Sequence, residues 1–170
     1  MTEPPVHPAA LPPEKLLCDC NIQFTRRSGP GGQHRNKVET AAILTHRPSG
    51  VQAEASERRS QSQNRQVALA RLRINLAIEF RTPAAGSEPS KLWQSRLRGA
   101  RLEINPQHVD YAALLAEALD AIEFHRLDVR AAAESLACTP TQLVKLIKLE
   151  PQAFQAFNQR RAAGGLKPLK

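Results

Sequence analysis

The amino-acid sequence predicts an α+β fold in which a small antiparallel sheet packs on a long helix and an all-α C-terminal extension follows. Three observations support this: short alternating apolar stretches within residues 17–55, one long amphipathic stretch over 60–80, and helical periodicity beyond residue 91. A hydrophobic content of 41% is sufficient for a core, and an aromatic content of 4% predicts a core of Leu, Ile, Val and Ala.

The N-terminal stretch leads into the first predicted strand. Residues 1–16 are rich in proline, which predicts an extended and mobile lead-in. Residues 17–26 alternate in polarity as a strand does, with Cys18 and Cys20 on one face. The Gly- and Pro-containing residues 28–32 predict a loop after this strand.

A hairpin and a long helix complete the α+β part. Strand-like stretches at residues 40–45 and 51–55 are joined by residues 46–50, where Pro and Gly predict a tight turn. Residues 60–80 place apolar side chains at helical spacing and predict one long helix. Pro83 is expected to end it.

The changes of pattern divide the chain into four segments. A Pro-rich N-terminal segment covers residues 1–16, and a compact domain that carries the sheet and the long helix covers 17–82. A linker and a basic segment, the latter expected to be helical, follow over 83–104. A helical domain then covers 105–170.

Helical periodicity in this last domain predicts four helices. The first two cover residues 110–124 and about 128–137. The third has Thr139 as its N-cap and ends before Pro151. The last ends at Gly164–Gly165, where glycine can adopt the left-handed cap.

Residues 129–147 also have the spacing of a helix-turn-helix motif. Its second helix would place Thr141, Gln142, Lys145 and Lys148 on the outer face. A plain helical hairpin is the favoured alternative, because the preceding helix is acidic and no arginine cluster marks a DNA-facing side. We therefore expect this pair of helices to serve as a docking module.

The charge of the chain points to a polyanionic partner. The formal net charge is +8 and the sequence pI is about 10.0. Residues 18–82 hold eleven basic and five acidic residues, so most of the excess lies there. Nearly all of these cations are arginines, which suit bidentate contacts with phosphate. The alternative is a basic surface that has no partner.

Several classes of site and location are not expected. The three cysteines are too few for a zinc site and show no CxxC spacing, so no metal and no cofactor is predicted. No apolar run is long enough for a membrane span. The N-terminus carries acidic residues and no arginine, unlike a signal or transit peptide. A monomer in a reducing cytoplasm is the resulting expectation.

The stretch Gly29-Pro30-Gly31-Gly32-Gln33 is the one that predicts chemistry. Adjacent glycines let backbone amides approach a ligand closely, and an exposed backbone N–H can stabilise developing negative charge on oxygen. Arginines and a lysine flank this loop, which suggests a nucleic-acid backbone as the ligand. No Ser-His-Asp set is evident, so water would be the attacking group. The alternative is an ordinary glycine turn on a basic surface.

The surrounding residues resemble class-I peptide chain release factors. FTRRSGPGGQHRNK at residues 24–37 is similar to the family's GGQ stretch, and LTHRPSGV at 44–51 is similar to its hairpin turn. Arg59-Ser60-Gln61, followed by Asn64-Arg65, is similar to a third family segment. Three matches in the family's order make a specific signal over about residues 18–80. Residues 17–82 are therefore identified as a release factor GGQ domain.

The resemblance implies that Gly31, Gly32 and Gln33 are catalytic. In the family this loop enters the peptidyl-transferase centre and promotes hydrolysis of the ester that joins peptide to tRNA. The backbone N–H of Gln33 would stabilise the reaction, and its side chain would limit which nucleophile enters. Further residues would contact ribosomal RNA or shape the loop: Arg26, Arg27, Ser28, His34, Arg35, Asn36, Lys37, Arg59, Gln61, Asn64 and Arg65. The sequence departs from the family pattern at Arg35 and at Ser62-Gln63.

The resemblance also implies the partners, namely large-subunit ribosomal RNA at the peptidyl-transferase centre and peptidyl-tRNA. About sixteen residues precede the first predicted strand, so a codon-reading domain is not expected. We therefore expect an enzyme that hydrolyses peptidyl-tRNA independently of the codon and rescues stalled ribosomes or large subunits. Residues 105–170 would be a docking module for the ribosome, for tRNA or for a partner protein. The alternative is a non-catalytic ribosome- or RNA-binding regulator, but the intact GGQ motif argues against it.

Overall fold

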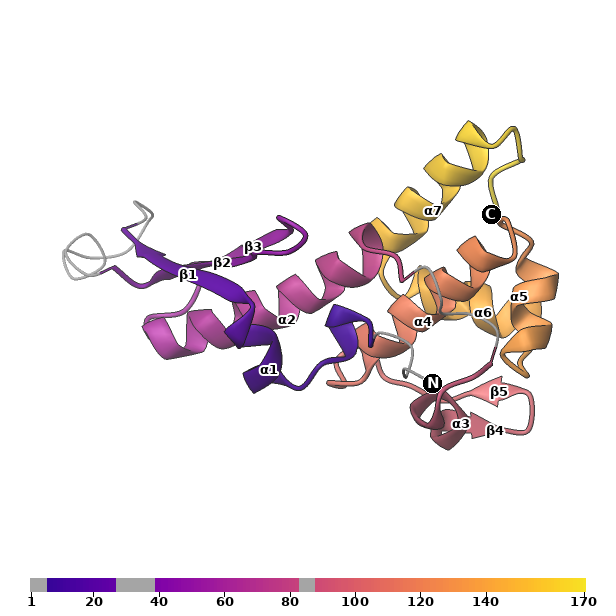
Figure 1. The fold of residues 1–170 in the computed structure, drawn as a ribbon, viewed down its shortest axis with the longest axis horizontal. Helices are drawn as coiled ribbons and strands as arrows, with labels where there is room; N and C mark the ends of the chain where they lie inside the picture. Colours follow the sequence, from indigo (N-terminus) through magenta and orange to yellow (C-terminus); the bar gives the residue numbers. More distant parts are fainter. Residues whose placement is uncertain (1–5, 27–38, 83–87) are drawn as a thin grey trace.

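The computed structural model describes residues 6–26, 39–82 and 88–170, and it confirms the predicted fold class (Figure 1). A small three-stranded antiparallel sheet packs on a long helix, and a helical region follows. In chain order the elements are η1 Pro8–Ala10, α1 Pro13–Cys18, β1 Cys20–Thr25, β2 Ala41–His46, β3 Gln52–Ala55, α2 Gln61–Glu79, α3 Lys91–Arg96, β4 Leu97–Arg98, β5 Arg101–Leu102, α4 Tyr111–Phe124, α5 Val129–Ser135, α6 Pro140–Lys148 and α7 Pro151–Ala163.

The sheet has the order β1-β2-β3, and small side chains form its buried face. Ala55 lies opposite Ala42, and Ala53 lies opposite Leu44; all four side chains are buried. Helix α2 contacts both β2 and β3. Side chains of alternate residues share one face of a strand, so these residues all face α2. Because the alanine side chains are small, the helix can approach the strands closely.

The predicted turn between β2 and β3 is confirmed. Gly50 has φ +74°, in the left-handed region that favours glycine. The His46 ring nitrogen Nδ1 lies 2.7 Å from Ser49 Oγ, and burial lowers the pKa of His46. Arg47 donates to the main-chain oxygens of Asp19 (3.4 Å) and Cys18 (2.5 Å), which attaches the turn to the junction of α1 and β1.

The predicted extended lead-in is wrong for the described N-terminal residues. Element η1 and helix α1 each begin at a proline, which the first helical turn accepts because its N–H groups lack intrahelical partners. Ala9 and Leu16 are buried in the core. Cys18 ends α1 whereas Cys20 begins β1, so the two cysteines do not share a strand face as predicted.

Helix α2 confirms the prediction of one long helix over residues 60–80, within one residue at each end. Ser60 is the N-cap, with its hydroxyl accepting from the Gln63 N–H. At the other end Phe80 is already extended, and Arg81 donates to the Ala77 (2.8 Å) and Ile78 (2.6 Å) carbonyl oxygens. These bonds satisfy carbonyls that the last helical turn leaves free. Pro83 itself lies outside the described residues.

The helical prediction for the basic segment is wrong from Leu97 onward. Strands β4 and β5 pair antiparallel, and Gly99 takes φ +60° in the two-residue turn between them. Helix α3 precedes this hairpin, and its Trp93 is fully buried. The indole N–H of Trp93 donates to the Leu136 carbonyl oxygen at 2.9 Å, which ties α3 to the end of α5.

The four predicted C-terminal helices are confirmed as α4 to α7. Thr139 caps α6, since its hydroxyl accepts from the Gln142 N–H at 3.2 Å. Gly165, with φ +73°, follows the end of α7. Within the described part of the chain, no helix is long and apolar enough to cross a membrane.

The buried core runs without interruption from the sheet into the C-terminal helices. Helix α2 contacts α4 as well as the sheet. Arg73 of α2 is also buried, and it donates to the carbonyl oxygens of Ala9 (3.0 Å) and Val109 (2.8 Å). The helical region therefore covers a side of the same long helix that supports the sheet.

Candidate functional site

The predicted catalytic residues Gly31, Gly32 and Gln33 lie outside the described residues. The same holds for six predicted RNA contacts: Arg27, Ser28, His34, Arg35, Asn36 and Lys37. The structure does describe the residues on either side of 27–38, at the end of β1 and just before β2. We refer to residues 25–26 and 39–41 as the stem.

The two sides of the stem are adjacent. Thr25 at the end of β1 pairs with Ala41 at the start of β2, at the end of the sheet that points away from α4 to α7 (Figure 1). Arg26 Nε lies 3.6 Å from Glu39 Oε1 across the stem, with more than half of both side chains exposed. An exposed ion pair of this kind contributes about 0.2–1 kcal/mol at most, so it adds little to the strand pairing.

Asn64 fixes the return side of the stem to α2. Its side chain is fully buried. The amide nitrogen Nδ2 donates to the carbonyl oxygens of Thr40 (2.7 Å) and Arg58 (2.9 Å), and Oδ1 accepts from the Arg58 N–H (2.8 Å). These bonds occupy both donors and one lone pair of a side chain that has no contact with solvent. Of the two roles expected for Asn64, this geometry favours shaping the loop.

Gln61 holds Glu39, the residue before Thr40. Its amide nitrogen Nε2 donates to the Glu39 carbonyl oxygen at 3.0 Å. Gln61 and Asn64 both belong to the first turn of α2, so this turn holds two consecutive residues, Glu39 and Thr40. Two of the three family-like segments thus meet at the stem, whereas the third forms the turn at the opposite end of β2.

Exposed cations surround the start of α2. Arg59 and Arg65 are exposed, and within the described ranges neither side chain has an ion-pair partner. Arg71, six residues further along α2, differs because it is paired with Glu57 at 2.7 Å. Within the described ranges, Arg58, Arg59 and Arg65 are thus exposed cations of this region that form no ion pair with a described acid.

Sequence reasoning missed Glu39, Thr40 and Arg58 as partners in the stem. Each takes part through a backbone carbonyl oxygen, which every residue possesses, so no residue type marks these positions. The feature of the sequence that could have indicated these contacts is the polar pair Gln61 and Asn64 at the start of a helix. Residues three apart in a helix lie near one face, so the two side chains can reach the same segment.

No group of three or more His, Cys, Asp or Glu side chains is placed to hold a metal ion within the described ranges. The thiols of Cys18, Cys20 and Cys138 are free. Burial raises the pKa of Cys138 to about 11, so this thiol is neutral at physiological pH and unsuited to act as a nucleophile.

The predicted outer face of α6 is exposed at Thr141, Lys145 and Lys148, whereas Gln142 is half-buried. Helices α5 and α6 contact each other, as both the helix-turn-helix and the plain hairpin interpretation require. A groove lies beside this helix pair and is lined by Thr141, Lys145 and Lys148 among others.

Comparisons with known proteins identify a domain family for this chain. The RF-1 domain model matches residues 16–105, more than half of the chain. The chloroplastic peptide chain release factor PrfB1 of Arabidopsis thaliana is 50% identical over 60 residues, 35% of this chain and 13% of that protein. Peptide chain release factor 1 of Symbiobacterium thermophilum is 39% identical over 79 residues, 46% of this chain and 22% of that protein.

Peptide chain release factor 1 of Xylella fastidiosa is 44% identical over 70 residues, which is 41% of this chain and 19% of that protein. The chain therefore aligns with less than a quarter of the length of each of these relatives. The family match includes residues 27–38, the stem and the first turn of α2. On this match the chain belongs to the RF-1 domain family.

Proposed function

We propose that this chain hydrolyses the ester bond of peptidyl-tRNA on the ribosome without reading a stop codon. Gly31, Gly32 and Gln33 are the proposed catalytic residues. The observation that carries the proposal is the stem: a Gly-Gly-Gln segment is connected to paired strand ends, and Asn64 and Gln61 hold its return side against α2. A fixed stem favours catalysis because small displacements of a reacting group cost much of the rate.

The proposed chemistry needs no side-chain nucleophile. Water attacks the ester carbonyl carbon, and the bond between that carbon and the tRNA oxygen breaks. One proton of the water goes to the tRNA oxygen and the other to solvent, so the products are a free peptide carboxylate and the tRNA hydroxyl. The backbone N–H of Gln33 donates to the oxygen on which negative charge develops. Glycines at positions 31 and 32 let the backbone approach the ester because they carry no Cβ.

Ribosomal RNA is the proposed binding partner of the surface around the stem. Arg26, Arg59 and Arg65 are exposed there, and guanidinium groups bind phosphate through paired N–H donors. Arg27, Ser28, His34, Arg35, Asn36 and Lys37 are proposed as further contacts from the connected segment. Asn64 and Gln61 act on this surface through the stem.

We propose independence from the codon because, among the residues that the structure describes, those outside the family match form η1, the start of α1 and helices α4 to α7, and α4 packs against α2. The relatives that match are peptide chain release factors by name, and only 13–22% of their length aligns with this chain. We propose rescue of stalled ribosomes or of separated large subunits as the role, in the cytoplasm, with residues 105–170 as the docking part.

Peptide release from defined ribosomal complexes tests this function. Ribosomes with a stop codon, a sense codon or no codon in the decoding site, and large subunits carrying peptidyl-tRNA, are each mixed with the protein. We expect release without a stop codon, and Gln33→Ala should lower its rate at least tenfold, about 1.4 kcal/mol in activation free energy. Gln63→Ala is the matched control, since Gln63 is exposed on α2. Its rate should equal that of the wild type.

The outcomes separate the two parts of the proposal. If the wild type releases no peptide from any substrate, the hydrolase proposal is wrong and the non-catalytic regulator takes its place. If release requires a stop codon, hydrolysis stands but independence from the codon is wrong. Equal rates for Gln33→Ala and Gln63→Ala would remove Gln33 from the proposed mechanism.

A further inference from the structure

The charges of the C-terminal region are separated in space although they are nearly balanced in number. Residues 105–170 hold eight basic and seven acidic residues. Four of the acids belong to α4 or its N-cap, and three of these pair with arginines: Asp110 with Arg96 (2.5 Å), Asp120 with Arg81 (3.6 Å) and Glu123 with Arg160 (3.0 Å). Residues 124–170 hold eight basic and three acidic residues, and one of the eight, Arg160, pairs with Glu123, so this end of the molecule still has an excess of positive charge.

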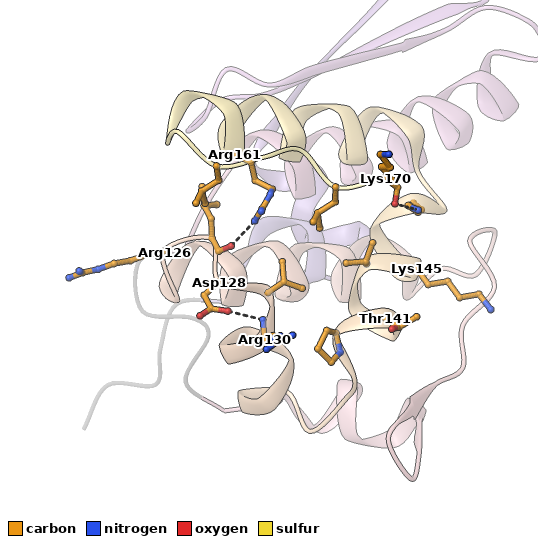
Figure 2. A pocket seen from close by; sticks show the side chains of 14 residues that line it. Arg126, Asp128, Arg130, Thr141, Lys145, Arg161 and Lys170 are labelled. Atoms are coloured by element: carbon orange, nitrogen blue, oxygen red, sulfur yellow. Dashed lines mark hydrogen bonds between the residues drawn. The ribbon is translucent and has the colours of Figure 1, made fainter.

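A groove of about 860 Å³ opens at this basic end (Figure 2). It lies between the start of α5, helix α6 and the segment that follows α7. Its apolar lining comes from all three: Leu127, Val129, Pro140, Val144, Leu166 and Leu169. The volume falls in the range of sites that bind a ligand or an inserted segment.

The wall made by residues 166–170 is held in place by side chains. Asn158 of α7 donates to the Leu169 carbonyl oxygen (3.1 Å) and accepts from the Leu169 N–H (2.8 Å). Lys148 Nζ donates to the Lys170 carbonyl oxygen at 2.5 Å, and Arg161 Nε donates to the Lys167 carbonyl oxygen at 2.9 Å. These bonds fix the backbone of the segment, so the groove is formed before anything binds in it.

Some charged groups of the groove are already used within the protein. Lys148 and Arg161 donate to the backbone of the wall. Asp128, the acid in the lining, caps α5 by accepting from the Arg130 and Ala131 N–H groups at 2.9 and 3.2 Å. Its carboxylate is therefore directed to the start of that helix (Figure 2).

Other cations of the groove have no partner within the described ranges. The side chains of Arg126, Arg130 and Lys145 are exposed and lie in no ion pair with a described acid. Figure 2 shows Arg126 and Lys145 extending away from the groove at opposite ends. The groove thus combines an apolar interior with unpaired positive charges at its edges.

We propose that this groove binds an acidic amphipathic segment of a partner protein. Apolar side chains of the segment lie on Val129, Val144 and the other apolar residues of the lining, and its carboxylates face Arg126, Arg130 and Lys145. An amphipathic helix suits this arrangement, because it presents apolar anchors on one face and charged side chains beside them. Such complementary charges fix orientation and increase the rate of association.

Nucleic acid fits the groove less well. Single-stranded RNA binds through base stacking on aromatic side chains together with phosphate contacts, and the residues that line this groove include no aromatic one. The apolar side chains of the lining cannot replace the hydrogen bonds that phosphate groups make with water. The proposal concerns recruitment and does not depend on whether the chain hydrolyses peptidyl-tRNA.

Binding of synthetic peptides to the full-length protein tests the proposal. A panel of labelled helical peptides of about 18 residues, or five turns, carries Leu or Ile on one face and Glu on the flanks. Scrambled peptides of the same composition and a single-stranded RNA of similar charge are the comparison probes. Fluorescence anisotropy at physiological salt gives the dissociation constants, and circular dichroism verifies that each variant is folded.

The key variant reverses three unpaired charges of the groove: Arg126→Glu, Arg130→Glu and Lys145→Glu. A control variant makes the same change in net charge at exposed residues elsewhere, with Lys15→Glu, Lys91→Glu and Arg98→Glu. We expect the groove variant to weaken peptide binding at least tenfold, about 1.4 kcal/mol, and the control variant to change it far less. Val144→Ser, which keeps every charge, should also weaken peptide binding several-fold.

Each opposite result would overturn the proposal. One is that no peptide of the panel binds. Another is that scrambled peptides bind as tightly as the amphipathic ones. A third is that the groove and control variants weaken peptide binding equally. RNA binding that the groove variant abolishes and Val144→Ser leaves unchanged, in the absence of peptide binding, would assign the groove to nucleic acid instead.

Discussion

Replacing Asn64 by alanine distinguishes its role in shaping the stem from a direct role in binding RNA. The substitution removes a fully buried amide that makes hydrogen bonds to Thr40 O, Arg58 O and Arg58 N. It leaves one N–H and two carbonyl oxygens without these partners. Because Asn64 also anchors the return side of the stem, the change should loosen residues 39–40 relative to α2.

The expected magnitude follows from the contacts. A hydrogen bond contributes about 1 kcal/mol net to stability, so the loss of three amounts to about 3 kcal/mol. Alanine has the higher helix propensity, which returns about 0.6 kcal/mol in the first turn of α2. The free energy of unfolding should therefore fall by about 2–3 kcal/mol. Asn64→Asp should cost at least as much, since it would bury a carboxylate against the Thr40 and Arg58 carbonyl oxygens.

Equilibrium unfolding in urea, followed by circular dichroism, measures this change, and ribosome binding is measured on the same samples. Gln63→Ala is the control, because it alters the neighbouring exposed amide on the same helix. A direct RNA contact predicts the opposite pattern, in which Asn64→Ala loses ribosome binding with unfolding free energy unchanged within about 0.5 kcal/mol. That pattern would refute the stem argument.

Three further predictions concern pH, packing and salt. Burial raises the pKa of Asp120 to about 6, although the nearby Arg81 opposes the shift. The folded protein therefore binds the Asp120 proton more tightly than the unfolded chain does, and the free energy of unfolding falls as pH rises from about 4 to 6. Asp120→Asn should therefore raise the unfolding free energy by up to about 3 kcal/mol above pH 7 and change it little below pH 4; urea unfolding showing no gain at pH 7 would contradict this. Trp93→Phe should cost about 1 kcal/mol or more, because the buried Leu136 carbonyl oxygen loses its donor; an unchanged thermal midpoint would speak against it. Affinity for ribosomal RNA should fall steeply with salt, and Arg65→Glu should weaken it and reduce the slope; salt-independent binding would remove RNA phosphates as the target.

The sequence predicted the sheet, the long helix and the C-terminal helices because these depend on local patterns. Ser60 and Thr139 cap helices where their residue type suggests, and Gly50 occupies the turn that Pro and Gly indicated. Periodicity, caps and turns are set by residues within one or two helical turns of each other. They are therefore readable from a single sequence.

Other features depend on contacts between distant residues. The prolines of the N-terminal stretch suggested an extended chain, but Ala9 and Leu16 gain burial against the core, and Arg73 bonds the Ala9 carbonyl oxygen from 64 residues away. The short hairpin of β4 and β5 has only the turn at Gly99 as a local signal. Apolar burial and long-range hydrogen bonds override local propensity at these places.

The candidate site shows the same division. Resemblance to a family identified Gln61 and Asn64 as residues of interest, but left open whether they touch RNA or the loop. Their partners are carbonyl oxygens of residues 22 and 24 positions earlier, which no local pattern specifies. The groove of residues 126–170 likewise depends on how α5, α6 and the segment after α7 come together.

Helix α2 sets a fixed length between the proposed chemistry and the proposed docking surface. Its nineteen residues extend over about 28 Å, with the stem held at its first turn and α4 contacted near its other end. A helix packed along this length does not bend easily, so a partner that holds the C-terminal helices also sets where the stem can reach. The distance from that partner to the peptidyl ester would then decide which ribosomal complexes are substrates. A complex with a different spacing would not bring the ester to Gln33.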